Sequence, residues 1–353
     1  MKIKVPSFIK WRYDVYCSEY VDLYGSLGFY LKHKKNNIAH IKQANIAYVY
    51  ANKRNVGDYI SFCGIRQLVG MPGMELLCSP AWKNEFRKHI NQIKAINPRC
   101  LLIIGGGGLL QPVFNDFWSE VLDSKLPYVM FGIGINRMQG RPEMEPSYIK
   151  KIVENASFIG VRDNYTQNLL TKITDAPIHI GICPSANFVN NNFWQDQPNR
   201  NKVLLHIYHP SDLRLAGADL DKISNSLKTA AGRLGYTYQE DSNMSANHMK
   251  TLERVSNAGL VVSSRLHGCI MSFSMGLPFV PLLCDEKISS FNESYTGVEG
   301  YVPSLFYDPD IAFNIVSKCL LNFDKQKAVL NESMLRNRSL AEKIKSLVAH
   351  KQP

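Results

Sequence analysis

The segment Leu260–Leu283 constrains the fold more than any other part of the chain. Its first apolar run, Leu260–Val262, ends at a pair of serines, and a helix-length apolar stretch, Cys269–Met275, follows. Gly276 and Pro278 then form a usual helix stop, after which a further apolar run begins. Short buried runs that alternate with a helix-length segment predict a strand, a helix and a second strand of a parallel sheet.

Arg265, His267 and Gly268 fall between the first of these runs and the predicted helix. They are therefore expected at the carboxyl end of a strand and at a helix N-terminus. Open α/β sheets bind ligands at this edge, and helix N-termini favour anions. An arginine and a histidine there could hold a phosphate or a carboxylate and pass a proton to it. Taken alone, the pair is also compatible with a surface salt bridge and a helix cap.

The same kind of edge recurs earlier in the chain. The first predicted strand, Asn45–Tyr50, leads into Asn55, Gly57 and Asp58. Asn55 and Asp58 can cap the helix that begins there, and Gly57 lets the backbone come close to a ligand. The junction is equally well explained as a purely structural connection between a strand and a helix.

Four consecutive glycines follow the predicted strand Cys100–Ile104 and open the segment Gly105–Leu110. Such a run costs conformational entropy, and the usual reason for it is a ligand that lies close to the backbone. The spacing differs from the nucleotide fingerprint G-x-G-x-x-G, and a second glycine-rich strand end follows around residue 134. The residues expected in ligand-binding turns are Gly106, Gly107, Gly108, Gly134 and Asn136.

Further strands are predicted at Phe158–Val161, which ends at Arg162 and Asp163, and at Ile178–Ile182. A segment rich in Asn, Gln and Pro then precedes a second series of alternating strands and helices. This alternation predicts two Rossmann-like, doubly wound α/β domains that face each other across a cleft. The expected division is an N-terminal extension at 1–43, a first domain at 44–190, a linker at 191–201, a second domain at 202–310 and a helical tail at 311–353 that could pack back on the first domain.

The charge balance points to an anionic partner. The 353 residues carry a formal net charge of +11, with a pI of about 9.1. Since the sequence has no nucleic-acid-binding motif, a phosphate-bearing ligand or an anionic lipid surface is expected rather than nucleic acid. Eight scattered cysteines show no metal-type spacing, which favours a reduced, cytosolic setting without a bound metal.

Residues 1–43 are rich in aromatic and basic side chains, and the first predicted strand begins only after them. This composition suits peripheral contact with a membrane interface. It also suits a helical arm that packs on the body of the protein or makes a homo-oligomer, and the sequence leaves these alternatives open. Because no apolar run of about 18 residues and no signal peptide is present, a cytoplasmic location is expected.

Six short motifs bring the junctions together. In chain order they are Asn55-x-Gly57-Asp58, Gly105–Leu110, Gly132-x-Gly134, Val161-Arg162-Asp163, Arg265-Leu266-His267 and Asp285-x-Lys287. Their order and spacing resemble those of the polysaccharide pyruvyl transferase family over about Asn45–Gly300. The resemblance implies a fold like that of the B-type glycosyltransferases (GT-B). It also implies transfer of the enolpyruvyl unit of phosphoenolpyruvate to a sugar as a cyclic ketal, without a cofactor or metal. The implied acceptor belongs to a bacterial capsule, exopolysaccharide or lipid-linked precursor.

The implied chemistry needs fixed cations, a general acid and a base. Arg162 and Arg265, one from each domain, are expected to bind the donor, because a guanidinium fork binds carboxylate or phosphate in a bidentate manner. His267 is the expected general acid, because imidazole titrates near neutrality. The other expected roles are phosphate binding by Lys287, phosphate binding or base action by His209, proton acceptance by Asp58, and acceptor or ligand contact by Asn55, Gly57, Gly106, Gly107, Gly108, Gly134 and Asn136.

Three features depart from the family pattern. Cys183 stands where family members usually carry the Asp of an Asp-Pro pair, and Asn136 stands where Pro is common. His206 and His209 occupy a region where an Arg is frequent. Two other functions therefore stay open. One is a GT-B glycosyltransferase that uses a nucleotide sugar, and the other is a catalytically inactive glycan- or phosphate-binding protein.

Overall fold

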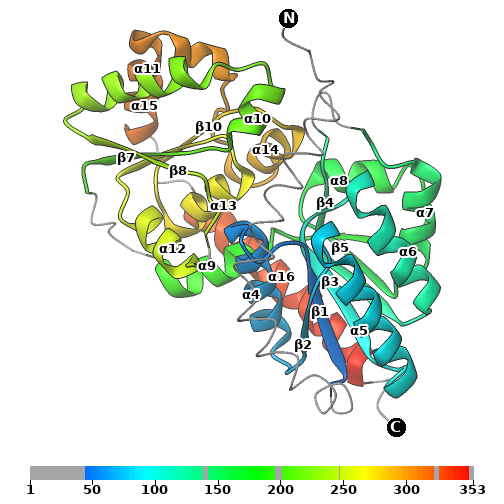
Figure 1. Ribbon diagram of the computed structural model, residues 1–353. Coiled ribbons are helices and arrows are strands. Elements are labelled where there is room, and N and C mark those ends of the chain that lie inside the picture. The colour runs from blue at the N-terminus through cyan, green and yellow to red at the C-terminus, as the bar shows by residue number, and fades with distance from the viewer. Residues whose placement is uncertain (1–43, 138–141, 195–200, 246, 322–325, 350–353) are drawn as a thin grey trace, which may run out of the picture.

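The structure is a computed structural model of the chain, and it describes residues 44–137, 142–194, 201–245, 247–321 and 326–349. The N-terminal extension at 1–43 lies outside these residues. The described strands form two parallel sheets, one of six strands in the order β2-β1-β3-β4-β5-β6 and one of four in the order β10-β9-β7-β8. Helices cover both faces of each sheet, which confirms the predicted pair of Rossmann-like α/β domains (Figure 1).

The first domain alternates strands with helices. Its strands are β1 (Ile46–Tyr50), β2 (Met74–Leu77), β3 (Leu101–Leu110), β4 (Tyr128–Ile135), β5 (Phe158–Val161) and β6 (Ile178–Ile180). The helices between them are α4 (Val56–Val69), α5 (Lys83–Ile96), α6 (Asn115–Ser124), α7 (Pro146–Glu154) and α8 (Asn164–Leu170). Short 3₁₀ helices, η1 (Pro80–Trp82) and η2 (Pro112–Phe114), lead into α5 and α6.

The second domain follows α9 (Ser185–Phe193), a helix that runs into the segment predicted as the linker. Its strands are β7 (Val203–Ile207), β8 (Thr237–Asp241), β9 (Leu260–Ser263) and β10 (Phe279–Pro281). Its helices are α10 (Pro210–Leu215), α11 (Leu220–Arg233), α12 (His248–Ser256), α13 (Leu266–Met275), α14 (Glu286–Phe291), η3 (Asn292–Thr296), η4 (Pro303–Tyr307) and α15 (Pro309–Leu321), and α16 (Gln326–Ala349) comes last. The predicted strand–helix–strand segment is β9, α13 and β10, and Gly276 ends α13 in the left-handed conformation, as its position predicts.

The glycine-rich segments lie within strands, so the prediction that these glycines form turns is wrong. β3 continues through the four glycines to its end, and β4 continues through its two glycines. Neighbouring protein atoms explain these glycines. A Cβ at Gly105 would lie 1.9 Å from the carbonyl oxygen of Phe131, and a Cβ at Gly106 would lie 2.9 Å from the Cβ of Ser61. The missing side chains let β4 and α4 pack directly against β3.

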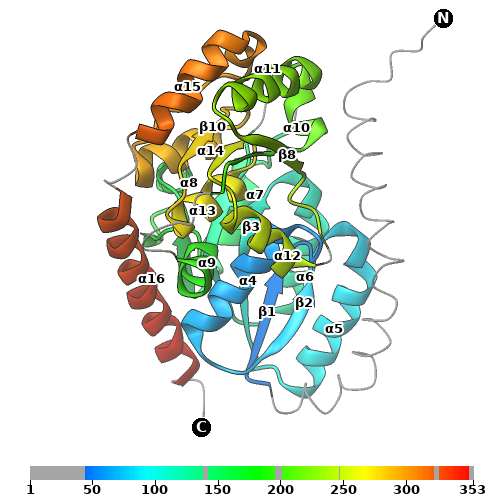
Figure 2. The same cartoon turned by 90° about the vertical axis from the view of Figure 1, so that its left-hand side faces the viewer.

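Helices from distant parts of the chain cover the two sheets. On one face of the first sheet, α5, α6 and α7 enclose an apolar cluster around the fully buried Trp118. On the other face, α16 packs beside α4, so the end of the described chain returns to the first domain (Figure 2). The helix before it, α15, packs beside α11 on the second domain (Figure 1). None of the helices in the described ranges combines the length and apolar character needed to cross a bilayer.

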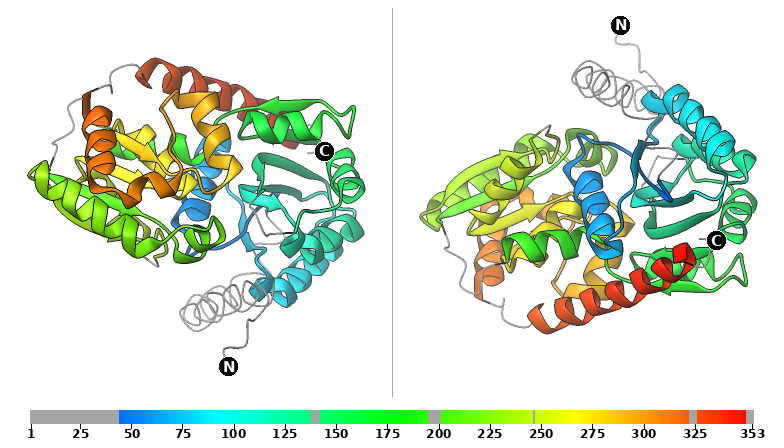
Figure 3. Two further views of the ribbon diagram at one scale, coloured as in Figure 1. Left: turned by 90° about the horizontal axis from the view of Figure 1, so that it is seen from above. Right: turned by 90° about the horizontal axis from the view of Figure 1, so that it is seen from below.

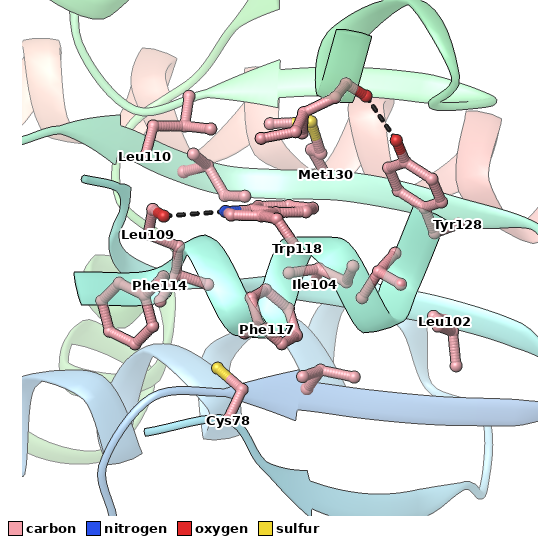
Figure 4. Packing of buried hydrophobic residues seen from close by; sticks show 14 of the residues in the cluster. Cys78, Leu102, Ile104, Leu109, Leu110, Phe114, Phe117, Trp118, Tyr128 and Met130 are labelled. Carbon is pink, nitrogen blue, oxygen red and sulfur yellow. Dashed lines mark hydrogen bonds between the residues drawn. The ribbon is translucent and has the colours of Figure 1, made fainter. Parts of the chain in front are cut away.

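Trp118 also satisfies an irregular point of the first sheet. The pairing of β3 with β4 shifts register between Gly107 and Leu110. Such a shift leaves backbone groups without a partner in the ladder. The indole N–H of Trp118 donates a hydrogen bond of 2.9 Å to the carbonyl oxygen of Leu109 (Figure 4). This bond fixes the carboxyl end of β3, where residues of the candidate site lie.

The two domains, which lie side by side (Figure 3), are joined by backbone hydrogen bonds. The loop after β1 forms an isolated antiparallel bridge with the loop after β8. Val56 N–H donates to the Asn243 carbonyl at 3.2 Å, and Ser245 N–H donates to the Arg54 carbonyl at 2.9 Å. The bridge holds the carboxyl ends of the two sheets at a fixed separation.

Candidate active site

A cavity of about 240 Å³ lies where the carboxyl ends of the two sheets face each other. Its walls come from the segments that follow β1 to β5 of the first sheet and β7 to β10 of the second. This is the edge at which α/β sheets bind ligands. The predicted site residues that line it are Asn55, Asp58, Gly108, Asn136, Arg162, His209, Arg265, His267 and Lys287.

Among the residues that the structure describes, three cations line this cavity. Arg162 directly follows β5, Arg265 caps the start of α13 after β9, and Lys287 lies in the first turn of α14 after β10. One cation therefore comes from the first domain and two come from the second. Cations held on both sides of a small cavity favour an anionic ligand that bridges the domains.

Each cation lies beside a carboxylate. The closest approaches are 3.6 Å between Arg162 and Asp163, and 2.6 Å between Lys287 and Asp285. Arg265 donates from Nη1 to Oδ2 of a third carboxylate, Asp212, at 2.9 Å. The sequence analysis did not single out Asp212, which lies on the short helix α10 and meets Arg265 only through the tertiary fold.

Several buried polar atoms of the cavity wall have no hydrogen-bond partner. Most buried polar atoms in proteins are hydrogen-bonded to protein or water, so a group of orphans on one wall marks a place for ligand atoms or water. The atoms are Asn136 Oδ1, Arg162 Nε and Ser264 Oγ. They come from both domains and surround the cations.

Asp58 lies in the first turn of α4, and its carboxyl is buried at the cavity. Asn55 is the N-cap of the helix and accepts a hydrogen bond from Gly57 N–H, which confirms one of the two predicted caps. Burial raises the pKa of Asp58 to about 7, against the opposing pull of Arg162, Arg265 and Lys287. A carboxyl that titrates near neutrality can donate or accept a proton at physiological pH.

His267 lies in the first turn of α13 and is 8% exposed. Burial lowers its pKa well below the usual 6.5, and the charges of Arg162, Arg265 and Lys287 lower it further. The imidazole is therefore neutral at pH 7 in the free protein. In this state it is suited to accept a proton, whereas the sequence predicted a general acid.

The predicted glycines make room for the site's side chains. A Cβ at Gly57 would lie 2.0 Å from Nδ1 of His267, and a Cβ at Gly134 would lie 2.5 Å from Nε of Arg162. Likewise, Gly107 faces Oδ1 of Asp58 and Gly108 faces Asn136. Of the predicted glycines, Gly108 also lines the cavity. Their role in the structure is to let site residues pack against β3, β4 and α4.

His209 lines the cavity from the second domain, and its ring already has a structural function. Its Nδ1 accepts a hydrogen bond from Ser211 N–H at 3.3 Å and lies 2.6 Å from the Ser211 hydroxyl. The ring thereby caps α10, the helix that carries Asp212. His206, the other histidine noted in this region, is fully buried and does not line the cavity.

The first-domain end of the cavity was not predicted from the sequence. Asn52, Ser79 and Gln111 bring amide and hydroxyl groups to it, and Pro80 and Phe114 bring apolar surface. The segments after β2 and β3 supply most of this end. Neutral hydrogen-bonding groups beside a flat apolar surface suit a sugar ring better than a second anion.

Comparison with known proteins gives the family. The sequence profile described as Polysaccharide pyruvyl transferase matches residues 23–286, which is most of the chain. The chain belongs to the polysaccharide pyruvyl transferase family. The match includes the motifs around Asp58, Arg162 and His267 from which the resemblance was first inferred. No curated protein sequence matches the chain significantly.

Solved structures of UDP-GlcNAc 2-epimerases share the fold. The enzyme from Methanocaldococcus jannaschii, in complex with UDP-GlcNAc and UDP, has a TM-score of 0.53 at 9% identity and covers 82% of this chain and 98% of its own. The enzyme from Neisseria meningitidis, bound to UDP-GlcNAc, has a TM-score of 0.51 at 10% identity and covers 86% of this chain and 99% of its own. The enzyme described as a putative UDP-N-acetylglucosamine 2-epimerase from Listeria monocytogenes has a TM-score of 0.55 at 9% identity and covers 85% of this chain and 94% of its own. These similarities confirm the GT-B-like fold.

Proposed function

We propose that this member of the polysaccharide pyruvyl transferase family transfers the enolpyruvyl group of phosphoenolpyruvate to two hydroxyls of one sugar. The product is a cyclic ketal, and inorganic phosphate is released. The observation that carries the proposal is the convergence of Arg162, Arg265 and Lys287 on a cavity that also holds Asp58 and His267. The donor needs three such cations, because it carries a carboxylate and a phosphate on one small carbon skeleton.

In this proposal the donor bridges the two domains. The guanidinium groups of Arg162 and Arg265 bind its carboxylate and phosphate, and Lys287 adds a point charge to the phosphate. The cavity volume of about 240 Å³ is below the roughly 300–1,000 Å³ of pockets that hold drug-sized ligands. A donor as small as phosphoenolpyruvate fits a cavity of this volume.

The reaction needs one proton delivered to the donor and two removed from the acceptor. A proton added to the C3 methylene turns it into a methyl group and makes C2 electrophilic. One sugar oxygen then forms a bond to C2, a second sugar oxygen forms another, and the bond from C2 to the phosphate oxygen breaks. Of the two hydroxyl protons, one replaces the proton given to C3 and the other leaves with phosphate.

We assign the proton donor to Asp58 and the base to His267, the reverse of the expectation from sequence. With a pKa of about 7, Asp58 keeps its proton in roughly half of the molecules at neutral pH. The neutral imidazole of His267 can accept the proton of the attacking hydroxyl. Donor binding would neutralise the three cations that lower both pKa values, and both groups would then hold a proton more tightly.

The acceptor in this proposal is a sugar of a bacterial surface polysaccharide or of its lipid-linked precursor. Its ring would lie at the end of the cavity formed by Asn52, Ser79 and Gln111, whose amide and hydroxyl groups can bond sugar hydroxyls. The Phe114 side of the cavity offers an apolar surface to the ring face.

The proposal is tested by incubating the full-length protein with phosphoenolpyruvate and a panel of glycosides that carry vicinal or 4,6-diol groups. The expected result is release of phosphate that depends on one acceptor, with a product heavier by one ketal-linked pyruvyl group. His267→Gln should bind the donor but release no phosphate. Binding of phosphoenolpyruvate without phosphate release for any acceptor would favour the inactive binding protein. Turnover of a nucleotide sugar instead would favour the glycosyltransferase.

A further inference from the structure

The Nε2 side of His267 faces a small buried polar cluster, which we call the Ser61 cluster and which consists of Ser61, Cys183 and Ser185. Nε2 lies 3.3 Å from Ser61 Oγ and 3.8 Å from Cys183 Sγ. Ser61 Oγ and Cys183 Sγ lie 3.3 Å apart, and Ser185 Oγ donates to Cys183 Sγ at 3.1 Å. All three residues are at most 1% exposed, so water does not compete for these contacts.

The hydrogens of this cluster can be assigned one by one. The single hydroxyl hydrogen of Ser61 is donated to the carbonyl of Gly57, one turn earlier in α4, at 2.8 Å. Toward His267 the Ser61 oxygen can then act only as an acceptor, so Nε2 must carry the hydrogen. Ser185 gives its hydrogen to Cys183, whose own S–H is left to donate to Ser61 Oγ. Each hydrogen is used once, and no donor faces another donor.

The other ring nitrogen, Nδ1, lies on the edge of the ring that packs against Gly57. Among the described residues, Nδ1 of His267 has no hydrogen-bond partner, and His267 is part of the cavity wall. The backbone of Gly57 lies against the Nδ1 edge of the ring without donating to it. A neutral imidazole with hydrogen on Nε2 has its lone pair on Nδ1.

We propose that Ser61 and Cys183 are positioning residues that fix His267 in the Nε2–H tautomer, so that Nδ1 is the atom that takes up the proton in the cavity. The role of Nδ1 as a base rests on the proposed function. The tautomer itself does not, because it follows from the hydrogen bonds of the Ser61 cluster.

The residue at position 183 decides whether a negative charge lies next to Nε2 of His267. The charged groups that act on His267 from the packed elements are Arg162, Arg265 and Lys287, with Asp58 beside them. Cys183 does not bring to Nε2 the carboxylate that an aspartate would bring there. A carboxylate at the same position would stabilise the imidazolium and raise the pKa of His267. Cys183 therefore keeps the histidine available as a proton acceptor.

The tautomer can be measured without any substrate. We would record ¹⁵N spectra of the full-length protein with labelled histidine at pH 7, where the two neutral tautomers and the imidazolium have different signatures. His267, assigned by its loss in His267→Gln, should show the Nε2–H pattern. Ser61→Ala should lose this preference and show the Nδ1–H form or a mixture. Wild-type protein in the Nδ1–H form, or an unchanged pattern in Ser61→Ala, would overturn the proposal.

A matched control is available on the helix that carries His267. Ser272 is fully buried, and its hydroxyl donates to the carbonyl of Gly268 at 2.9 Å, the same local bond that Ser61 makes in α4. Ser272→Ala should keep the wild-type signature of His267. If Ser61→Ala does not fold, Cys183→Asp tests the same contact from the other side. It should convert His267 to the imidazolium at pH 7, and a neutral ring in that variant would contradict the assignment.

Kinetics give a second readout once an acceptor is known. Ser61→Ala should lower kcat roughly 10- to 100-fold, because the lone pair is no longer held at Nδ1, while the Kd for phosphoenolpyruvate stays within about twofold. An equal loss of kcat in Ser272→Ala would show that Ser61 acts through packing and not by fixing the tautomer. If no acceptor supports turnover, the proposed function is wrong. The tautomer assignment is then still tested by the ¹⁵N measurement, which needs no substrate.

Discussion

The Nδ1 atom of His267 lies so close to the backbone of Gly57 that a methyl group on Gly57 would be 2.0 Å from it. Gly57 belongs to α4 of the first domain, and His267 belongs to α13 of the second. The contact therefore crosses the boundary between the domains, directly beside the cavity. It explains the glycine of the Asn55-x-Gly57-Asp58 motif by the position of a histidine 210 residues later in the sequence.

Gly57→Ala should displace the His267 ring and reduce kcat about 100-fold, because a shift of about 1 Å in a catalytic group can cost that much. The free energy of unfolding should also fall by about 1–3 kcal/mol, because the new methyl group would overlap the buried ring and the surrounding structure must shift. Gly232→Ala is the matched control, because Gly232 also lies in a helix and a Cβ there meets nothing within 4 Å. It should raise the stability slightly and leave kcat unchanged. Equal activity of the two variants would refute the account of Gly57.

Arg265→Lys should keep the fold and lose about 100-fold or more in kcat/KM, because one ammonium group cannot reproduce the two parallel hydrogen bonds of a guanidinium. Asp212→Asn should keep the charge of Arg265 but weaken its orientation, and raise KM for the donor about tenfold. Asp310→Asn is the control, because Asp310 pairs with Arg233 on the surface and exposed ion pairs contribute little. Steady-state kinetics that show an unchanged KM in Asp212→Asn would remove Asp212 from the site.

Asp58→Asn should stabilise the protein at alkaline pH. Because the pKa of Asp58 is about 7 when folded and near 3.8 when unfolded, the native state binds its proton more tightly. The stability contributed by this proton is fully present below pH 4 and is lost as pH rises through 7. From pH 5 to pH 8.5 the unfolding free energy of the wild type should therefore fall by about 3 kcal/mol relative to that of Asp58→Asn. Urea unfolding that gives the same gap at both pH values would contradict the raised pKa.

The same carboxyl should shape the pH dependence of catalysis. If Asp58 donates the proton, kcat/KM should fall as pH rises above about 7, because this parameter reports the free enzyme. The fall in kcat should begin at a higher pH than the fall in kcat/KM. The bound donor offsets the charge of the surrounding cations, and the pKa of Asp58 is then higher than in the free enzyme. A kcat/KM that is flat from pH 6 to 9 would reassign the proton donor.

Trp118→Phe should destabilise the protein by about 1–3 kcal/mol, because the buried Leu109 carbonyl loses its hydrogen bond. The bond ties down the bulged end of β3 next to Gly108, so the Kd for the donor should also weaken. Denaturant unfolding and a donor titration measure both effects. A change in unfolding free energy below about 0.5 kcal/mol would mean that the carbonyl finds another partner.

The sequence predicted those parts of the molecule that depend on local pattern. Arg162, Arg265 and His267 stand directly beside buried runs, and the fold places each of them at a strand end on the cavity. The two domains follow from the same alternation of runs. Asn55 and Gly276 were recognisable as helix caps, because capping depends on neighbouring residues alone.

The rest depends on contacts between distant parts of the chain. His267 meets Ser61 across 206 positions and Cys183 across 84, and Arg265 meets Asp212 across 53. No local pattern encodes such pairs. The glycines of β3 were misassigned for a related reason. A glycine run is typical of a turn, but here it is needed because β4, Ser61 and Asp58 pack against that strand. The roles proposed for Asp58 and His267 depend on burial, which shifts both pKa values and is not visible in a motif.

The most direct test of the central claim is a calorimetric titration of the full-length protein with phosphoenolpyruvate at pH 7, beside the same titration with UDP-GlcNAc. The account predicts saturable binding of phosphoenolpyruvate at one site, lost in both Arg162→Ala and Arg265→Ala and retained in Asp310→Asn. It predicts no binding of the nucleotide sugar. Binding of UDP-GlcNAc alone, or binding of phosphoenolpyruvate that survives the loss of both arginines, would contradict it.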